Sequence, residues 1–267
     1  MTIMASARNR YYLQTLGITL WQARYASPPS ECVADIAAAP VEPENDAVTN
    51  RVTTGVEGDV LIANEAAVAN ASVAAVSTED DLHTQLQRLG AQVASCTQCE
   101  LYQNRKQAVF GVGNPLADWM IIGEAPGAEE DRLGQPFVGR AGKLLDKMLA
   151  AIQLDRQSAY IANIIKCRPA NNRDPRPEEI HQCLGFLQQQ IAIMRPKMIL
   201  LVGRIAAQTL LESTLPIGKL RGKVYQYQPY GIPMVVTYHP AYLLRSPTEK
   251  QKSWQDLILA RSSYRVS

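Results

Sequence analysis

The sequence predicts an α/β domain with three α/β/α layers, built around a central, mostly parallel, four-stranded sheet. From about residue 118 onward, four short and nearly continuously apolar segments alternate with longer segments of helical periodicity. Such apolar segments are typical of parallel strands that are buried on both faces, with helices covering each face. Each one is followed by Gly, Asn or His-Pro, so we expect the functional site where the strands end.

The predicted strands and helices follow one another in a regular order. Helix 177–194 has the clearest start, because Pro177 suits a first helical turn and the carboxylates of Glu178 and Glu179 favour the positive end of the helix dipole. The strands are expected at residues 119–122, 159–162, 198–202 and 234–237, and the helices at residues 141–152, 177–194, 205–211 and 248–261.

Composition divides the chain into residues 1–24, 25–81 and 82–267. Residues 25–81 have no aromatic residue after Tyr25 and one basic residue, Arg51, against eleven acidic ones, which predicts a disordered linker rich in Ala and Pro. Residues 82–267 hold twenty-three Lys or Arg against fourteen Asp or Glu. A basic domain favours a polyanionic partner such as nucleic acid, although a solvated basic face would give the same composition.

Residues 1–24 contain a patch of aromatic and aliphatic side chains that is too short to fold alone. We expect a peptide that docks on a partner, and the alternative is an element that packs back on the main domain. No apolar run is long enough to span a membrane, and the N-terminus lacks the apolar core of a signal peptide. The protein is therefore expected in the cytoplasm.

Four cysteines have the spacing of a metal site. Cys96 and Cys99 form a C-x2-C pair, and Cys167 and Cys183 follow with fifteen residues between them. In a reducing compartment, four thiolates suit zinc or an iron-sulfur cluster better than disulfides, and the bland alternative is buried thiols without a ligand. Cys32 lies in the acidic linker and is expected to be a spectator.

A loop rich in Gly and Pro follows the first predicted strand, where backbone N–H groups can approach a ligand. The loop carries an acidic cluster that includes Glu124 and Glu130, together with a lone aromatic residue, Phe137. Arg140 or Lys143, at the start of the next helix, are positioned to meet a phosphate.

Two further polar residues end predicted strands. Asn163 can both donate and accept hydrogen bonds, which reading a base edge requires, although an asparagine there can also simply turn the chain. His239 can donate to an oxygen that gains negative charge, or it can be structural. In the segment after it, Tyr242, Leu243 or Leu244 are candidates for insertion into a base stack.

Together these motifs resemble the family-four uracil-DNA glycosylases, the iron-sulfur branch of the uracil-DNA glycosylase superfamily. The resemblance extends from about residue 81 to 261 and includes GEAPG, EED, RLGQPFVG, NIIKCRP, HPAYLLR and the two cysteine pairs, in the family's order. It implies a uracil-DNA glycosylase fold and hydrolysis of the N-glycosidic bond of uracil in DNA, the first step of base excision repair. It also implies a structural [4Fe-4S] cluster held by Cys96, Cys99, Cys167 and Cys183.

The resemblance also implies roles for single residues. Phe137 would stack on a flipped-out uracil, Asn163 would hydrogen-bond its O4 and N3 edge, and His239 would stabilise negative charge on its O2. Ala125 stands in the substrate site where better-known families have an Asp or Asn that activates water, which leaves Glu130 as the first candidate for that role and Glu124 as the second.

The remaining implied roles concern DNA and protein partners. Arg140, Lys143 and Arg245 would hold phosphates, and Leu243 would insert into the base stack. The segment NRYYLQTLGITLWQAR resembles the opening of the psi subunit of the bacterial DNA polymerase III clamp loader. Residues 8–24 would then bind the chi subunit and tether a monomeric enzyme to the replication machinery.

Two other functions remain open on sequence grounds. One is a DNA-binding adaptor of the clamp loader whose glycosylase fold is inactive, which the presence of Phe137, Asn163 and His239 disfavours. The other is a glycosylase for another deaminated base, such as hypoxanthine or xanthine, which the shape of the pocket would decide.

Overall fold

Short apolar runs form the central sheet of the computed structural model, which describes residues 79–264. Within these residues the sheet has six strands in the order β1-β3-β2-β4-β6-β5. The four central strands pair in parallel, and the two edge strands pair antiparallel to their neighbours. The strands are β1 (Val112–Gly113), β2 (Trp119–Gly123), β3 (Ala159–Asn163), β4 (Met198–Val202), β5 (Val224–Tyr227) and β6 (Ile232–Thr237).

The four predicted strands are confirmed as β2, β3, β4 and β6, but the predicted count of four was too low, because the sheet also includes β1 and β5. β1 has only two residues, and the side chains of β5 alternate between exposed and half-buried. Antiparallel edge strands bury at most one face, so their sequences lack the continuous apolar run by which the central strands were predicted.

Helices and 3-10 turns connect the strands. The predicted helices 141–152, 177–194, 205–211 and 248–261 are confirmed as α4, α5, α6 and α9, each within two residues. The elements are α2 (Glu79–Ser95), η1 (Glu100–Gln103), α3 (Ala128–Leu133), α4 (Arg140–Ala151), η2 (Ala170–Asn172), α5 (Pro177–Met194), α6 (Arg204–Leu210), α7 (Ile217–Leu220), α8 (Pro240–Arg245), η3 (Pro247–Glu249) and α9 (Lys250–Ser263).

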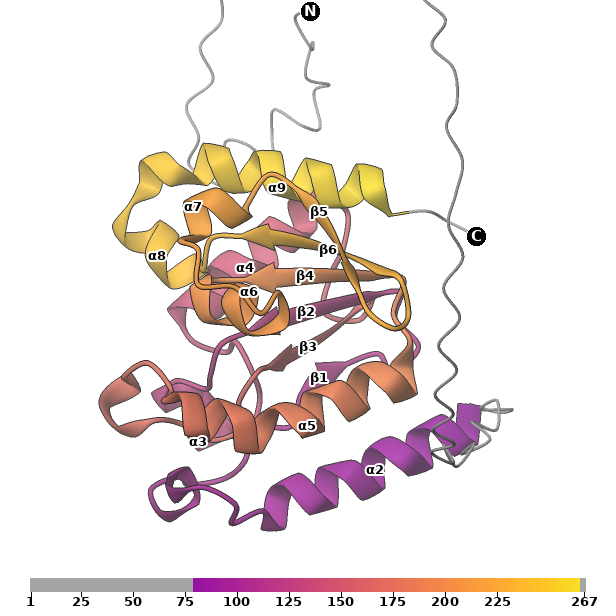
Figure 1. Cartoon of the computed structure of the whole chain (residues 1–267), viewed down its shortest axis with the longest axis vertical. Helices are drawn as coiled ribbons and strands as arrows, with labels where there is room; N and C mark the ends of the chain where they lie inside the picture. The colour runs from indigo at the N-terminus through magenta and orange to yellow at the C-terminus, as the bar shows by residue number, and fades with distance from the viewer. Residues whose placement is uncertain (1–78, 265–267) are drawn as a thin grey trace, which may run out of the picture. The chain divides into compact units, whose positions relative to one another are not determined.

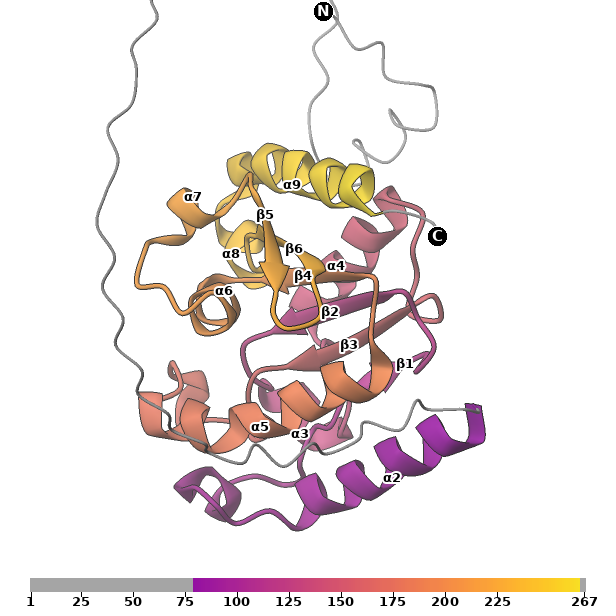
Figure 2. The same cartoon turned by 45° about the vertical axis from the view of Figure 1, so that its right-hand side comes forward.

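Alternation of side chains along each central strand produces two separate hydrophobic clusters, one on each face of the sheet. In β2, Met120 and Ile122 belong to the cluster covered by α5 and α6, whereas Trp119 and Ile121 belong to the cluster covered by α4, α8 and α9. Figures 1 and 2 show α9 and α5 on opposite sides of the strands, with α2 packed beyond α5. The predicted three-layer arrangement is therefore confirmed, and α2 adds an outer helix to one face.

The N-terminal boundary differs slightly from the prediction. Helix α2 begins at Glu79, three residues inside the segment 25–81 that was predicted as linker. The predicted peptide 1–24, the rest of the linker and Cys32 lie outside the residues that the structure describes. Within residues 79–264, no helix is long and apolar enough to cross a membrane.

Strand order determines where a ligand site can form. β2 is the first of the four parallel strands in the chain, yet it lies between β3 and β4. The chain therefore runs outward from β2 in both directions, and the crossovers to β3 and β4 lie on opposite faces of the sheet. The carboxyl ends of strands at such a reversal border a crevice, where open α/β sheets bind ligands.

A buried ion pair fastens α9 to the end of α7. The carboxylate of Asp256 is fully buried, and it accepts a hydrogen bond of 3.0 Å from Nε of Arg221. Burial raises the pKa of Asp256 to about 6, and the Arg221 guanidinium opposes that rise. Without Arg221, a buried carboxylate would lose its charged partner.

We therefore expect Arg221→Met to lower the free energy of unfolding by about 3–5 kcal/mol, measured by urea denaturation. The control is Arg132→Met, which removes a surface ion pair with Glu129 and should cost far less. Equal losses in the two variants would contradict the stabilising role of the buried pair.

Candidate active site

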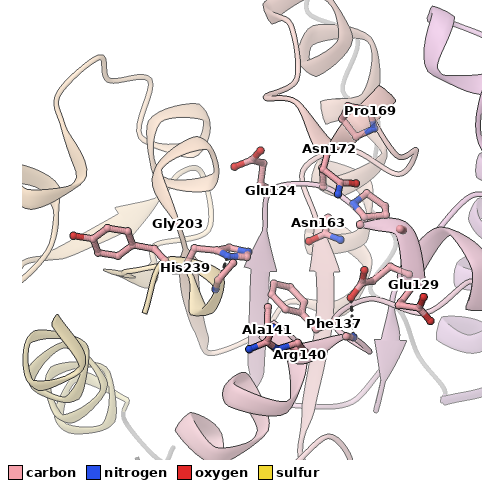
Figure 3. A pocket seen from close by; sticks show the side chains of 18 of the residues that line it. Glu124, Glu129, Phe137, Arg140, Ala141, Asn163, Pro169, Asn172, Gly203 and His239 are labelled. Carbon is pink, nitrogen blue, oxygen red and sulfur yellow. Dashed lines mark hydrogen bonds between the residues drawn. The ribbon is translucent and has the colours of Figure 1, made fainter. Parts of the chain in front are cut away.

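The carboxyl ends of all four parallel strands open into one cleft of about 830 Å³. Glu124 follows β2, Asn163 ends β3, Gly203 follows β4, and His239 follows β6 (Figure 3). The strand ends therefore meet at a shared cleft, as the sequence predicted.

Asn163 contributes a buried amide to this cleft. The residue is 2% exposed, and its Oδ1 atom accepts no hydrogen bond within the described part of the chain. A buried acceptor without a partner is costly, so the cleft favours a ligand that brings a donor. Gly123 leaves room for this arrangement, because a Cβ atom there would lie 2.5 Å from Oδ1 of Asn163 and 2.6 Å from Cζ of Phe137.

Phe137 places an aromatic ring beside the amide. Its φ angle of 54° is in the left-handed region, which is strained for a residue with a side chain. Arg156 stabilises this backbone by donating hydrogen bonds to the carbonyl oxygens of Pro136, at 3.1 Å, and of Phe137. Gly142 permits the close packing, since a Cβ atom there would lie 1.7 Å from the Phe137 carbonyl oxygen. The ring forms a flat wall suited to a planar ligand.

His239 is held as a neutral hydrogen-bond donor. Its Nδ1 atom accepts a hydrogen bond of 3.1 Å from the backbone N–H of Ala241, so the proton of the neutral ring is on Nε2. Burial lowers the pKa of His239 to about 4; nearby Arg245 lowers it further, and Glu130 partly opposes the shift. Figure 3 shows the side chains of Phe137, Asn163 and His239 around one part of the cleft, and the Phe137 and His239 rings are 5.6 Å apart.

The two predicted carboxylates have different surroundings. Oε1 of Glu130 accepts hydrogen bonds from the backbone N–H groups of Val138, at 3.0 Å, and Gly139, at 3.1 Å, so Glu130 holds the loop that leads into α4. Burial raises the pKa of Glu124 to about 7, Asp174 adds to the shift, and Arg204 opposes it. Glu124 can therefore change its charge near neutral pH.

Three of four further residues predicted for the site line the cleft, and the fourth does not. Ala125 and Arg140 line it, and Arg245 does so from the last turn of α8. Lys143 is exposed on α4 but does not line the cleft.

Leu243, which was predicted to contact DNA, is buried in this structure. Leu243 is 1% exposed and belongs to the hydrophobic cluster beneath α8. Its neighbours Tyr242 and Leu244 are 36% and 39% exposed. The short helix begins at Pro240, and its packing on α4 turns the side chain of Leu243 inward, which the sequence alone did not reveal.

Several residues that line the cleft were not predicted. Arg204 could have been found, because Gly203 and Arg204 directly follow a predicted strand, where the other site residues also lie. The loop between Cys167 and Cys183 gave no comparable local signal. The unpredicted polar and apolar lining residues include Pro169, Asn172, Arg173, Ile217 and Tyr238.

The four predicted metal-ligand cysteines line one small second cavity. Cys96 and Cys99 follow α2, Cys167 lies after β3, Cys183 lies in α5, and none of the four forms a disulfide. Within residues 79–264, no three His, Cys, Asp or Glu side chains have the spacing that a single metal ion needs. A multinuclear cluster holds its thiolates farther apart than a single ion does, so the shared cavity and this spacing are compatible.

Polar groups surround the sulfur atoms. Arg105 Nη1 donates to Sγ of Cys167 at 2.9 Å, and the backbone N–H of Lys166 donates to Sγ of Cys183 at 3.3 Å. Burial raises the pKa of Cys183 to about 11, so a thiolate there requires a bound cation or cluster. These residues fit an iron-sulfur cluster, whose sulfurs commonly accept hydrogen bonds.

Comparison with known proteins identifies the family. The Uracil DNA glycosylase superfamily matches residues 110–259. The chain is 44% identical to the type-4 uracil-DNA glycosylase of Archaeoglobus fulgidus over 172 residues, which cover 62% of this chain and 86% of that protein. It is 42% identical to the type-4 enzyme of Pyrobaculum aerophilum, over 65% of this chain and 92% of that protein. By fold, cleft and sequence, the chain belongs to the uracil-DNA glycosylase superfamily and, within it, to the type-4 uracil-DNA glycosylases.

Proposed function

We propose that the protein is a uracil-DNA glycosylase that hydrolyses the N-glycosidic bond of uracil in DNA and starts base excision repair. The observation that carries this proposal is the buried amide of Asn163, whose Oδ1 atom lacks a partner within the described residues. Uracil offers an N3–H donor and an O4 acceptor, which match Oδ1 and Nδ2 of an asparagine. Cytosine offers an unprotonated N3 and an amine instead, so both hydrogen bonds would be mismatched.

The aromatic ring and the histidine complete the base site. Phe137 stacks on the uracil after it has rotated out of the DNA helix. As the bond between C1′ and N1 breaks, the electron pair moves onto the uracil ring, and His239 donates its Nε2–H hydrogen bond to O2. A neutral imidazole suits this role, since its low pKa keeps it a hydrogen-bond donor that does not titrate near neutral pH.

We assign the role of positioning the attacking water to Glu124. The sequence had placed Glu130 first for this role. Oε1 of Glu130 is already engaged by two backbone N–H groups, so Glu130 is better suited to positioning the loop. The carboxylate of Glu124 lines the cleft and can stabilise the cation-like sugar or orient the water that adds to C1′. Ala125, beside it, offers no polar group to compete for that water.

Basic residues at the cleft bind the DNA backbone. Arg140 and Arg245 are exposed and line the cleft, which supports phosphate contacts without sequence preference. Arg204 instead pairs with Asp174 at 2.5 Å. Lys143, exposed on α4, extends this basic surface away from the cleft.

Cys96, Cys99, Cys167 and Cys183 would hold a [4Fe-4S] cluster. When bound, the cluster supplies a structural cross-link, because hydrolysis moves no electrons between redox centres. Cys167 and Cys183 flank the loop that brings Pro169, Asn172 and Arg173 to the cleft, so ligation of both cysteines limits the movement of this loop.

The remaining assignments concern the state and surroundings of the enzyme. We propose that it acts as a monomer in the cytoplasm. The binding of residues 8–24 to the chi subunit also remains a proposal, and its support is the sequence resemblance alone.

Protein purified without oxygen should excise uracil from an oligonucleotide with a single uracil, measured as alkali-sensitive strand cleavage. Asn163→Ala should lower the rate about 100-fold, because two hydrogen bonds to the base are lost. The control Asn114→Ala changes an exposed loop and should retain the rate. Failure of the iron-loaded protein to excise uracil would contradict the proposal. Excision of hypoxanthine and binding of the chi subunit would then be measured.

The pH dependence of kcat/KM should reveal the titration of the Glu124 carboxyl group. If the carboxylate is the active form, kcat/KM should rise as pH increases through about 7, where Glu124 loses its proton. Glu124→Gln should be slower and lack this inflection. Glu129→Gln, which changes an exposed carboxylate at the same cleft, should keep it. An inflection that persists in Glu124→Gln would exclude Glu124 as its source.

Loss of one cysteine ligand should be visible in metal content. The wild-type protein should carry about four irons per chain. Cys99→Ser should reduce iron and sulfide content and lower the melting temperature, whereas Cys32→Ser should retain both. Unchanged iron content in Cys99→Ser would remove Cys99 from the set of ligands.

A further inference from the structure

Lys166 forms a buried polar network directly behind the base site. Its side chain is fully buried, and its Nζ atom donates hydrogen bonds to the backbone carbonyl of Asn163, at 2.9 Å, and to Oε1 of Gln190, at 2.6 Å. Gln190 Nε2 donates in turn to the backbone carbonyl of Phe110, at 3.1 Å, and to the Tyr160 hydroxyl, at 3.3 Å. The network therefore joins the end of β3 to α5 and to the segment before β1.

The hydrogen-bond partners of this buried lysine carry no formal charge. Both acceptors of its Nζ atom are neutral, one a carbonyl and the other an amide. A buried amine without acceptors would cost free energy, and these two hydrogen bonds reduce that cost. Met or Leu at this position would fill the same space in the core but would lack the hydrogen bond to the strand end that carries Asn163.

The same residue also borders the cysteine cavity. Lys166 lines that cavity, and its backbone N–H donates to Sγ of Cys183. On the other side, Asn163 lines the cleft and holds the unpartnered Oδ1 atom. Lys166 thus contacts Cys183 through its backbone N–H and the end of β3 through its side chain.

We propose that Lys166 is a positioning residue for base recognition: the hydrogen bond from its Nζ atom fixes the strand end that carries Asn163 and so orients the Asn163 side-chain amide for the base. The proposal rests on the proposed role of Asn163 in reading uracil. A carbonyl held at 2.9 Å limits rotation of the peptide that follows Asn163, which keeps the amide in place before the base arrives. Gln190 supports Lys166 from α5.

A double-mutant cycle tests this role. Single-turnover excision rates are measured for wild type, Lys166→Met, Asn163→Ala and the double variant, on preparations matched for iron content. Affinity for DNA containing a 2′-fluorinated deoxyuridine, whose glycosidic bond resists cleavage, gives a readout apart from activity. Leu187→Ala, a change in the apolar core on the same helix as Gln190, is the control for a general loss of stability.

Lys166→Met should lower the rate and the affinity for the fluorinated uracil DNA about 10-fold to 100-fold in the wild-type background. In the Asn163→Ala background it should lower them less than about threefold, because the amide that Lys166 orients is already gone. Affinity for DNA without uracil should stay unchanged. Leu187→Ala should lower stability without this dependence on Asn163.

The proposal would be overturned if Lys166→Met lowered the excision rate and the affinity equally in the wild-type and Asn163→Ala backgrounds. It would also be overturned if loss of iron were the only defect of Lys166→Met. If Lys166→Met does not fold, Gln190→Leu keeps the lysine but removes its support, and it should show the same dependence on Asn163 at smaller size. A wild-type rate in Asn163→Ala would overturn the proposed role of Asn163 and, with it, that of Lys166. The single variant therefore separates failure of the proposed function from failure of Lys166 alone.

Discussion

Parallel pairing of β3, β2, β4 and β6 is the constraint on which the site depends. Trp119 of β2 is in register with Ala159 of β3 and Met198 of β4, so the three strands begin at the same level. Strands of similar length then end at the same level, which brings residues far apart in the chain to one cleft. A shift of one residue in any pair would exchange the side chains of the two clusters, and the close packing of each cluster opposes such an exchange.

Close packing at the strand ends determines the shape of the base site. Gly123, Gly142 and Gly203 each lie where a Cβ atom would press on Asn163, Phe137 or His239. The missing side chains allow a buried ring, an amide and an imidazole to share a small space, and two hydrogen bonds from Arg156 offset the strain at Phe137. The cleft is therefore organised before a ligand arrives, which reduces the entropy lost on binding.

The sequence predicted the elements that leave a local pattern of apolar residues. It missed the features that depend on contacts between residues far apart in the chain. The central strands were recognisable because burial on both faces leaves a continuous apolar run, and α4, α5, α6 and α9 were recognisable by helical periodicity. The edge strands leave no such trace, and the inward position of Leu243 depends on how α8 packs. The raised pKa of Glu124 depends on burial and on Asp174, fifty residues away in the chain, and the role of Glu130 depends on two backbone groups.

The cleft and the cysteine cavity are not independent, because a single segment of five residues serves both. Asn163 begins this segment in the cleft, and Cys167 ends it at the second cavity. Ile164 and Ile165 are fully buried between them, so movement of one end is transmitted to the other through a packed core. A cluster held by these cysteines would fix the segment at one end, and the base would fix it at the other. A displacement at the cysteine cavity would therefore reach the strand end that carries Asn163 through this packed segment.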